Sequence, residues 1–280
     1  MVDVGRWRLG VYGDKAKPVA AAEDIVKLHE ENSGKSVLML HGYAGYPGEF
    51  YSLIPLFFER GYDVFIPRLP GMGTSGDDFR SSEENDWLGL ARNVLKTLEE
   101  EYSDIVLVSH SMGTFLSVLL SSNEKVSMQF LIAPAFSTSF GIGDEELEKP
   151  GTEDYERSIP WKSDDSYHLS YPGAPRDDEV LGREYWSHFY ASDALAFTRL
   201  KKMALDVLES VTIPTYVYHG LKDETAPPDG LVETFSKVKG RVRIKIFDEG
   251  THLLMYDRCR DVEKELIASI ASVLDGRPAL

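Results

Sequence analysis

The sequence has a single cysteine, no long apolar run and no apolar segment at its beginning. Because Cys259 is the one cysteine in 280 residues, the chain cannot form an internal disulfide, and its fold must depend on a hydrophobic core. No stretch reaches the roughly 18 apolar residues that span a bilayer, and the first ten residues lack the apolar part of a signal peptide. These absences favour a cytoplasmic protein without a membrane span.

Basic side chains are also scarce relative to acidic ones. The chain has 30 Lys and Arg against 46 Asp and Glu, which gives a formal charge of −16. A negatively charged surface repels the phosphate backbone of a nucleic acid, so we expect no nucleic-acid partner. The acidity is otherwise explained by solubility and does not identify a substrate. The hydrophobic content of 42% is enough for one large domain.

Short apolar runs alternate with stretches of helical periodicity along most of the chain. Such runs are typical of strands buried on both faces, and strands that alternate with helices form a mostly parallel sheet. The sequence therefore predicts an α/β fold with a mostly parallel central sheet and helices on both faces. Strands are predicted at residues 7–11, 36–40, 63–66, 105–108, 128–132, 214–218 and 242–247, and helices at 47–60, from 86 onward, and at 114–120, 229–238 and 258–274.

One segment breaks this alternation, between about residues 137 and 208. It contains acidic clusters, prolines and aromatic residues but no sheet-like run. About 70 residues are too many for a plain loop in a compact domain. We therefore predict an inserted cap or lid subdomain at 137–208, carried by a core domain that residues 1–136 and 209–280 form together.

The stretch from Ser109 to Gly113, which reads Ser-His-Ser-Met-Gly, lies between a predicted buried strand and a predicted helix. A strained turn in this context lifts a serine hydroxyl off the end of a sheet, and it needs small residues two positions to either side of that serine. The pattern predicts Ser111 as a nucleophile. Glycine is usual at the position of Ser109, and serine there is still small.

A serine hydroxyl needs a base to remove its proton and a third group to orient that base. His252 lies in the loop after the last predicted strand, and Asp223 lies in the loop after the strand before it. The order serine, acid, histidine matches the order found with elbows of this kind. We predict a triad of Ser111, Asp223 and His252, with Glu224 as the alternative acid.

Attack by a serine on a carbonyl also needs donors for the oxyanion that forms. Two backbone N–H groups usually supply them, one from the residue after the nucleophile and one from the loop after an earlier strand. These positions are Met112 and Tyr43, the second within His41-Gly42-Tyr43-Ala44-Gly45. His41 is interpreted as a residue that braces this loop.

The remaining histidines and the cysteine are interpreted as structural. His110 is expected to pack beside the nucleophile and His219 to support the acid loop, while Cys259 falls in the last predicted helix. No cluster of His, Cys, Asp and Glu has metal-ligand spacing, and no G-x-G-x-x-G follows a strand into a helix. We therefore expect neither a metal nor a cofactor.

Five stretches together carry a resemblance to a known family: LMLHGYAG, FIPRLPGMGTSGDDF followed by NDWL, VLVSHSMGT, HGLKDETAPP and EGTHLLMYD. The sequence resembles the α/β-hydrolase superfamily, and within it the bacterial monoacylglycerol lipase and carboxylesterase group. The resemblance implies the α/β-hydrolase fold with a cap. It also implies hydrolysis of a small-molecule ester or a monoacylglycerol through an acyl-enzyme. Because the predicted cap is aromatic and acidic rather than broadly aliphatic, we expect short to medium acyl chains.

Two departures accompany the resemblance, namely Ser109 in place of glycine and Gly71-Met72-Gly73 in place of a more usual G-H-G. Neither removes a group with a predicted catalytic role.

Several alternatives stay open on the sequence alone. A peptidase, a thioesterase or a carbon–carbon bond hydrolase can use the same scaffold, and a peptidase that acts on free N-termini would want carboxylates such as those between Asp164 and Glu179. A non-catalytic ligand-binding or signalling protein can retain the same pocket. Homo-oligomerisation is also left open.

Overall fold

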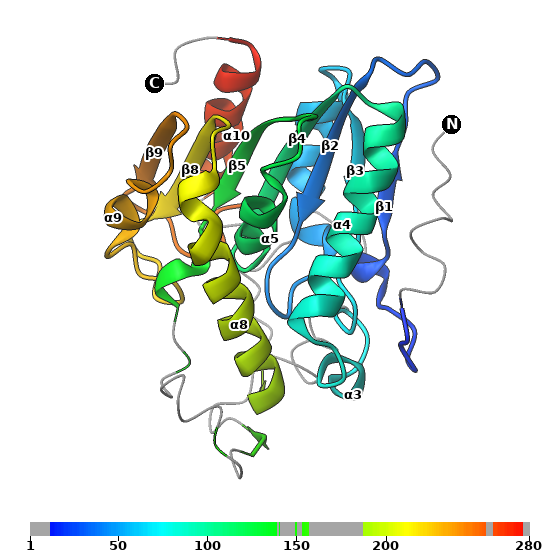
Figure 1. Cartoon of the computed structure of the whole chain (residues 1–280), viewed down its shortest axis with the longest axis vertical. Coiled ribbons are helices and arrows are strands. Elements are labelled where there is room, and N and C mark those ends of the chain that lie inside the picture. Colours follow the sequence, from blue (N-terminus) through cyan, green and yellow to red (C-terminus); the bar gives the residue numbers. More distant parts are fainter. Residues whose placement is uncertain are drawn as a thin grey trace.

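The computed structural model describes residues 12–138, 140, 149, 153–156, 187–255 and 260–276. In this part of the chain a seven-stranded sheet has the order β1-β3-β2-β4-β5-β8-β9, with β1 antiparallel to β3 and the other neighbours parallel (Figure 1). The strands are β1 (Ile25–Lys27), β2 (Lys35–Leu40), β3 (Asp63–Ile66), β4 (Asp104–His110), β5 (Val126–Ile132), β8 (Thr215–Gly220) and β9 (Val242–Phe247), with a separate short pair β6 (Tyr155–Glu156) and β7 (His188–Phe189).

Helices follow most strands of the sheet. They are α2 (Ile54–Phe58), α3 (Gly76–Phe79), α4 (Glu84–Glu101), α5 (Gly113–Leu120), α8 (Ala191–Val207), α9 (Leu231–Phe235) and α10 (Arg260–Leu274), with 3-10 turns η1 (Ala20–Ala22), η2 (Pro47–Leu53), η3 (Ala135–Ser137) and η5 (Leu208–Ser210).

The long helix α4 begins where its sequence provides a cap. The side chain of Glu83 accepts a hydrogen bond from the backbone of Asp86, and the Asp86 carboxylate accepts one from the backbone N–H of Glu83. This reciprocal pair satisfies two N–H groups that the first turn leaves without helical partners. This helix N-cap at Glu83 places the start of α4 at Glu84, two residues before the predicted position.

The core lies on both faces of the sheet because alternate strand residues point to opposite sides. In β4, Ile105 and Leu107 join the cluster that packs under α4, α5 and α8, whereas Val106 and Val108 join the cluster that packs under α2 and α10. Figure 1 shows α4, α5 and α8 in front of the sheet and α10 behind it. Burial on both faces explains why this strand is a continuous apolar run.

Most predicted elements agree with the structure, and the predicted fold class is confirmed. The differences include β1, α3, α8 and the short pair β6 and β7, which were not predicted. The segment at 47–60 begins as the 3-10 turn η2 before it becomes α2. The strand predicted at 7–11 lies outside the described residues.

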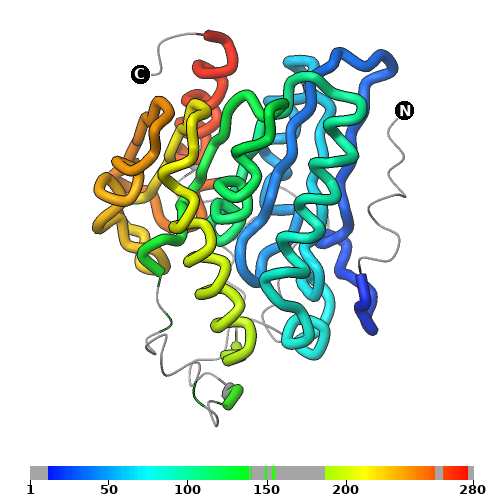
Figure 2. The backbone as a smooth tube through the Cα atoms, in the orientation of Figure 1, coloured from blue at the N-terminus to red at the C-terminus, as the bar shows by residue number. Residues whose placement is uncertain are grey.

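Most of the segment predicted as a cap also lies outside the described residues, so its bounds stay a prediction. The described part includes α8, which packs against α5 and α4. The start of α8 lies beside α3 at the edge where the strands end (Figure 2), and the rings of Phe79 and Tyr190 meet there at 5.9 Å. Part of the predicted cap segment therefore packs on the core domain.

A buried carboxyl on α8 makes stability depend on pH. Asp193 is fully buried, and this burial, together with the charge of Asp154, raises the pKa of its carboxyl to about 8. Between pH 4 and that value the folded protein holds a proton that the unfolded chain releases, so stability falls as pH rises. Asp193→Asn removes this dependence, and we expect it to melt about 5 °C higher than wild type at pH 8.5, with a gap that narrows toward pH 5.

Thermal unfolding between pH 5 and 9 measures this gap. Asp206→Asn, on the exposed side of the same helix, is the matched control and should follow wild type at every pH. A gap for Asp193→Asn that stays constant with pH would contradict the explanation.

Candidate functional site

Ser111 lies at the sharp turn between β4 and α5. Its backbone has φ +52°, in the left-handed region that residues with a side chain rarely adopt. A Cβ atom at Gly113 would lie 2.1 Å from the carbonyl oxygen of Leu40, so this position admits only glycine without movement of the backbone. Ser109 is fully buried and pairs with Leu40 and Leu131 in the sheet. The turn therefore has the geometry of a nucleophile elbow and accommodates serine at position 109.

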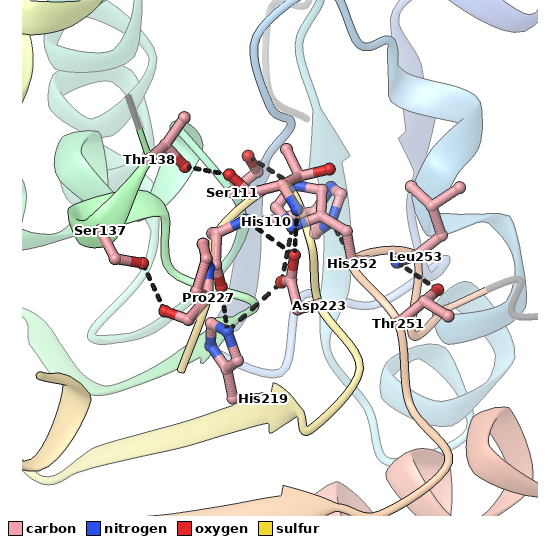
Figure 3. Close-up of polar contacts among 12 residues, drawn as sticks. His110, Ser111, Ser137, Thr138, His219, Asp223, Pro227, Thr251, His252 and Leu253 are labelled. Atoms are coloured by element: carbon pink, nitrogen blue, oxygen red, sulfur yellow. Dashed lines mark hydrogen bonds and ion pairs between the residues drawn. The ribbon is translucent and has the colours of Figure 1, made fainter. Parts of the chain in front are cut away.

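The structure brings the three residues of the predicted triad together from three different loops. The Nε2 atom of His252 lies 2.9 Å from Oγ of Ser111, and its Nδ1 atom lies 2.8 Å from Oδ2 of Asp223. Figure 3 shows the chain of contacts running from Ser111 through the imidazole to the carboxylate. Both distances are those of hydrogen bonds between a nucleophile, a base and an orienting acid.

Asp223 is buried and surrounded by donors. Its Oδ1 accepts hydrogen bonds from the backbone N–H groups of Thr225 (2.9 Å) and Ala226 (2.7 Å), and its Oδ2 lies 3.3 Å from Nε2 of His219. Burial alone raises the pKa of the Asp223 carboxyl, but the hydrogen bonds from His219, His252 and the backbone lower it well below its usual range. The carboxylate is ionised at neutral pH. Glu224, the alternative acid, is exposed.

His219 supports the acid loop, as predicted. Its Nε2 atom lies 2.7 Å from the carbonyl oxygen of Ala226, and a carbonyl only accepts, so this nitrogen carries the proton. The same N–H faces Oδ2 of Asp223. His219 and His252 thus both contact the same carboxylate oxygen of Asp223.

His252 is in the form that a base requires. Burial lowers the pKa of its imidazole, the hydrogen bond to Asp223 raises it, and the charge of His110 lowers it again, so that the net shift is downward. In the neutral ring Nδ1–H donates to Asp223, which leaves Nε2 free of a proton and able to accept one from Ser111. The arrangement can deprotonate the serine hydroxyl as it attacks.

The loop after β2 passes directly over Ser111. A Cβ atom at Gly42 would lie 2.9 Å from Cβ of Ser111, so glycine allows this close approach. The carbonyl of Gly42 accepts hydrogen bonds from Gly45 N–H (3.2 Å) and from Nδ1 of His41 (3.0 Å). In a trans peptide the next N–H points the opposite way, so the N–H of Tyr43 points out of this turn. Within the described residues the N–H of Met112 has no hydrogen-bond partner.

His41 braces the loop, as predicted. Its Nε2 atom accepts a hydrogen bond from the backbone N–H of Leu69 (2.9 Å), which ties the loop after β2 to the loop after β3. Burial lowers the pKa of His41 to about 4, so the ring is neutral and serves as a fixed donor and acceptor.

Comparison with known proteins adds an independent finding to this geometry. The sequence signature of the alpha/beta hydrolase family matches residues 37–265, which is most of the chain. The chain belongs to this family.

The relatives that this α/β-hydrolase resembles are named esterases and lipases. It is 23% identical over 249 residues to a carboxylesterase of Bacillus subtilis (strain 168), a match that covers 86% of this chain and 94% of the carboxylesterase. It is 30% identical over 95 residues to a thermostable monoacylglycerol lipase of Bacillus sp. (strain H-257), across 34% of this chain and 38% of the lipase.

Solved structures show the same fold. The monoacylglycerol lipase of Paleococcus ferrophilus superposes with a TM-score of 0.70 at 17% identity, covering 90% of this chain and 98% of the lipase. At this identity the likeness shows the architecture alone. The specificity of this α/β-hydrolase must therefore be argued from its own side chains.

Aromatic side chains gather beside the loop that carries Tyr43. The Tyr43 ring meets Phe79 at 5.0 Å, Phe140 at 5.6 Å and Phe197 at 5.7 Å between ring centroids. Phe115 adds a further contact to Phe197 at 5.2 Å. We call Tyr43, Phe79, Phe140, Phe197 and Phe115 the aromatic wall. It brings residues from the core domain together with residues from the predicted cap segment.

Sequence reasoning missed one group at this site, Glu49. Its carboxylate lies 2.9 Å from Nδ1 of His110, the residue that was interpreted as packing only. The two residues are 61 positions apart, and Glu49 falls in a helix-like stretch that no motif distinguishes. A glutamate buried in such a stretch is recognisable only once its partner is known.

Two further properties of this α/β-hydrolase concern membranes and metals. In the described part of the chain no helix is both long and apolar enough to cross a bilayer. Among the same residues no three His, Cys, Asp or Glu side chains are grouped in a way that could hold a metal ion. The predicted cytoplasmic location stays a prediction, and Cys259 and the carboxylates from Asp164 to Glu179 lie outside the described residues.

Proposed function

We propose that this protein is a serine hydrolase that cleaves carboxylic esters through an acyl-enzyme intermediate. One observation carries the proposal: the imidazole of His252 bridges the hydroxyl of Ser111 and the carboxylate of Asp223, with hydrogen bonds of 2.9 and 2.8 Å. Membership of the alpha/beta hydrolase family and the likeness to proteins named carboxylesterase and monoacylglycerol lipase support it.

In the first step Ser111 attacks the ester carbonyl. Its Oγ forms a bond to the carbonyl carbon while its proton passes to Nε2 of His252, and the imidazolium is stabilised by Asp223. The carbonyl oxygen becomes an oxyanion held by the N–H groups of Tyr43 and Met112. The tetrahedral intermediate then collapses, and His252 gives its proton to the departing alcohol.

In the second step water hydrolyses the acyl-enzyme. His252 accepts a proton from the water as its oxygen bonds to the acyl carbon, and it returns a proton to Oγ of Ser111 as the acid leaves. A positioned base contributes roughly 10² to 10⁴ in rate, and a single oxyanion donor contributes about 10² to 10³. Both contributions require that the hydrogen bond between Ser111 and His252 and the two backbone N–H donors keep their positions when the ester is bound.

The aromatic wall is the reason to propose a substrate with an apolar group next to its ester bond. Its rings meet edge-to-face or tilted and form a closely packed apolar cluster, in which Phe79, Phe115 and Phe197 are buried and Tyr43 and Phe140 are partly exposed. We propose short to medium acyl esters or monoacylglycerols as substrates. The bulk of the rings is the reason to expect that long chains are turned over more slowly.

A panel of substrates tests the proposal. We expect p-nitrophenyl esters from acetyl to decanoyl and the matching monoacylglycerols to be hydrolysed, with kcat/KM highest at short to medium chain length. The thioester and the aminoacyl amide with the same acyl group should be at least about tenfold poorer substrates. Initial rates over a range of concentrations give kcat/KM for each compound.

Preference for the amide would instead indicate a peptidase, and preference for the thioester would indicate a thioesterase. Absence of turnover of every compound, together with absence of labelling by a fluorophosphonate, would indicate a binding protein and would overturn the proposal.

A further inference from the structure

A buried pair of side chains, Glu49 and His110, lies next to the proposed base His252. Glu49 follows the loop that carries Tyr43, and His110 is the last residue of β4, next to Ser111. The two side chains are 5% and 3% exposed and meet at 2.9 Å. A Cβ atom at Gly45 would lie 2.2 Å from the Glu49 carboxylate, so the loop is closely packed around it. The pair therefore joins the loop that carries Tyr43, which we call the oxyanion loop, to the nucleophile elbow at Ser111.

The second ring nitrogen of His110 reaches the backbone of the proposed base. Its Nε2 atom lies 3.0 Å from the carbonyl oxygen of His252. A carbonyl only accepts, so Nε2 carries a proton, and an ionised Glu49 also only accepts, so Nδ1 carries one too. The hydrogen-bonding pattern thus fits an imidazolium at His110.

The surroundings favour this charged form of the pair. Burial alone lowers the pKa of His110, but the charge and hydrogen bond of Glu49, with the carbonyl of His252, raise it overall. Burial alone raises the pKa of Glu49, but the charge and hydrogen bond of His110 lower it overall. Both shifts point to proton transfer from the carboxyl to the imidazole.

The positive end of the pair lies close to the imidazole of His252. The two ring centroids are 5.1 Å apart. A positive charge at this distance disfavours a second one on the neighbouring ring. In the resting protein it therefore opposes protonation of His252, whereas Asp223 favours it.

We propose that the Glu49–His110 pair is a positioning device, which holds the His252 carbonyl in place and keeps the His252 imidazole in the neutral form that a base needs. The idea rests on the proposed function, since it assigns the pair a role toward His252. It gives His110 a task beyond packing, and it explains why a glutamate is buried beneath the oxyanion loop.

Among the described residues, three other titratable groups lie near these side chains. Asp223 faces His252 and lies near His110, His41 lies near Glu49, and His219 lies near His252. His41 and Asp223 have fixed charge states at neutral pH because the pKa of each is lowered. Among the groups that raise the pKa of His110, Glu49 has the largest effect, so its removal is the change most directly aimed at the charge of His110.

The substitution Glu49→Gln tests the device because it keeps the shape and a hydrogen bond but removes the negative charge. His110 should then become neutral, and the pKa of His252 should rise. We expect the acid limb of the kcat/KM profile to move about one pH unit higher than in wild type. At pH values below the limb, kcat/KM should then be about tenfold lower than that of wild type, and at pH values above the limb it should approach that of wild type. KM should change little.

A second measurement does not depend on activity. Side-chain ¹⁵N NMR of the histidines should show His110 doubly protonated at pH 8 in the wild type and singly protonated in Glu49→Gln. The double variant Glu49→Gln/His110→Gln removes both charges, and its acid limb should coincide with that of the single variant.

Another histidine–carboxylate pair provides the matched control. His29 and Asp63 also meet at 2.8 Å, but Asp63 begins β3, at the end of the strands opposite to Ser111. Asp63→Asn should lower stability and leave the acid limb where it is. A merely structural role for Glu49 predicts the same behaviour for Glu49→Gln.

The outcomes separate this inference from the proposed function. A neutral His110 in the wild type, or an acid limb that Glu49→Gln leaves unmoved, would overturn the inference even if the protein is an active esterase. A wild type without esterase activity or probe labelling would overturn the proposed function, and the NMR result would then decide the charge state of the pair by itself.

Discussion

Ser111→Ala should lower kcat/KM for a p-nitrophenyl ester by about 10⁴-fold or more. The hydroxyl of Ser111 is the group that would form the acyl bond, and Oγ is the atom that His252 contacts at 2.9 Å. Alanine fits the elbow without a clash because it only removes that oxygen. The loss should therefore appear in kcat, with the fold and the KM for an ester close to wild type. Steady-state kinetics and circular dichroism measure both.

Ser109→Ala is the control for this substitution. Ser109 is a second buried serine, two residues earlier, and within the described residues its Oγ has no hydrogen-bond partner. We expect it to retain most of the activity, and a fluorophosphonate should label wild type and Ser109→Ala but not Ser111→Ala. If Ser111→Ala keeps more than a few per cent of the activity, Ser111 is not the nucleophile.

The elbow was predictable because its signals are local. The apolar run of β4, the small residues around Ser111 and the helix α5 are adjacent in sequence, and each imposes its structure over a few residues. His252 and Asp223 were predictable for a different reason. Each follows a strand that the sequence marks clearly, and parallel strands place the loops at their carboxyl ends on the same edge of the sheet.

The Glu49–His110 pair depends instead on contacts that form only in the folded chain. His110 was visible as a residue next to the nucleophile, but its partner comes from η2 and its second contact is a backbone carbonyl 142 positions away. The strand β1 has only three residues, of which none is fully buried, so it carries little pattern of its own. It forms because β3 offers an edge with which it pairs.

The helix within the predicted cap segment shows the same limit. The acidic and aromatic composition of 137–208 predicted an inserted cap or lid but no helix within it, whereas the structure has α8 there, packed on α4 and α5. Phe197 and Leu200 are buried against the core, while the stripe they form is short and flanked by Arg and Lys. A weak apolar stripe becomes a packed helix when a neighbouring surface is available to cover it.

Asp223→Asn should lower kcat/KM by about 10⁴-fold, because it changes which nitrogen of His252 carries the proton. Oδ1 of Asp223 accepts two backbone hydrogen bonds, from Thr225 and Ala226, and only the amide oxygen of an asparagine can replace it there. The amide NH₂ must then face Nδ1 of His252. That nitrogen can accept only if its proton moves to Nε2, and a protonated Nε2 cannot take the proton of Ser111.

The neighbouring acid provides the control for this substitution. Glu224 is exposed, and Glu224→Gln changes a carboxylate to an amide one position away without touching the contacts of Asp223. We expect Glu224→Gln to keep activity within about twofold of wild type, while Asp223→Asn loses it. Kinetics on the same ester, with ¹⁵N NMR of His252 to identify its tautomer, measure both effects. Equal losses in the two variants would show that the charge of the loop, rather than the orientation of His252, is what Asp223 supplies.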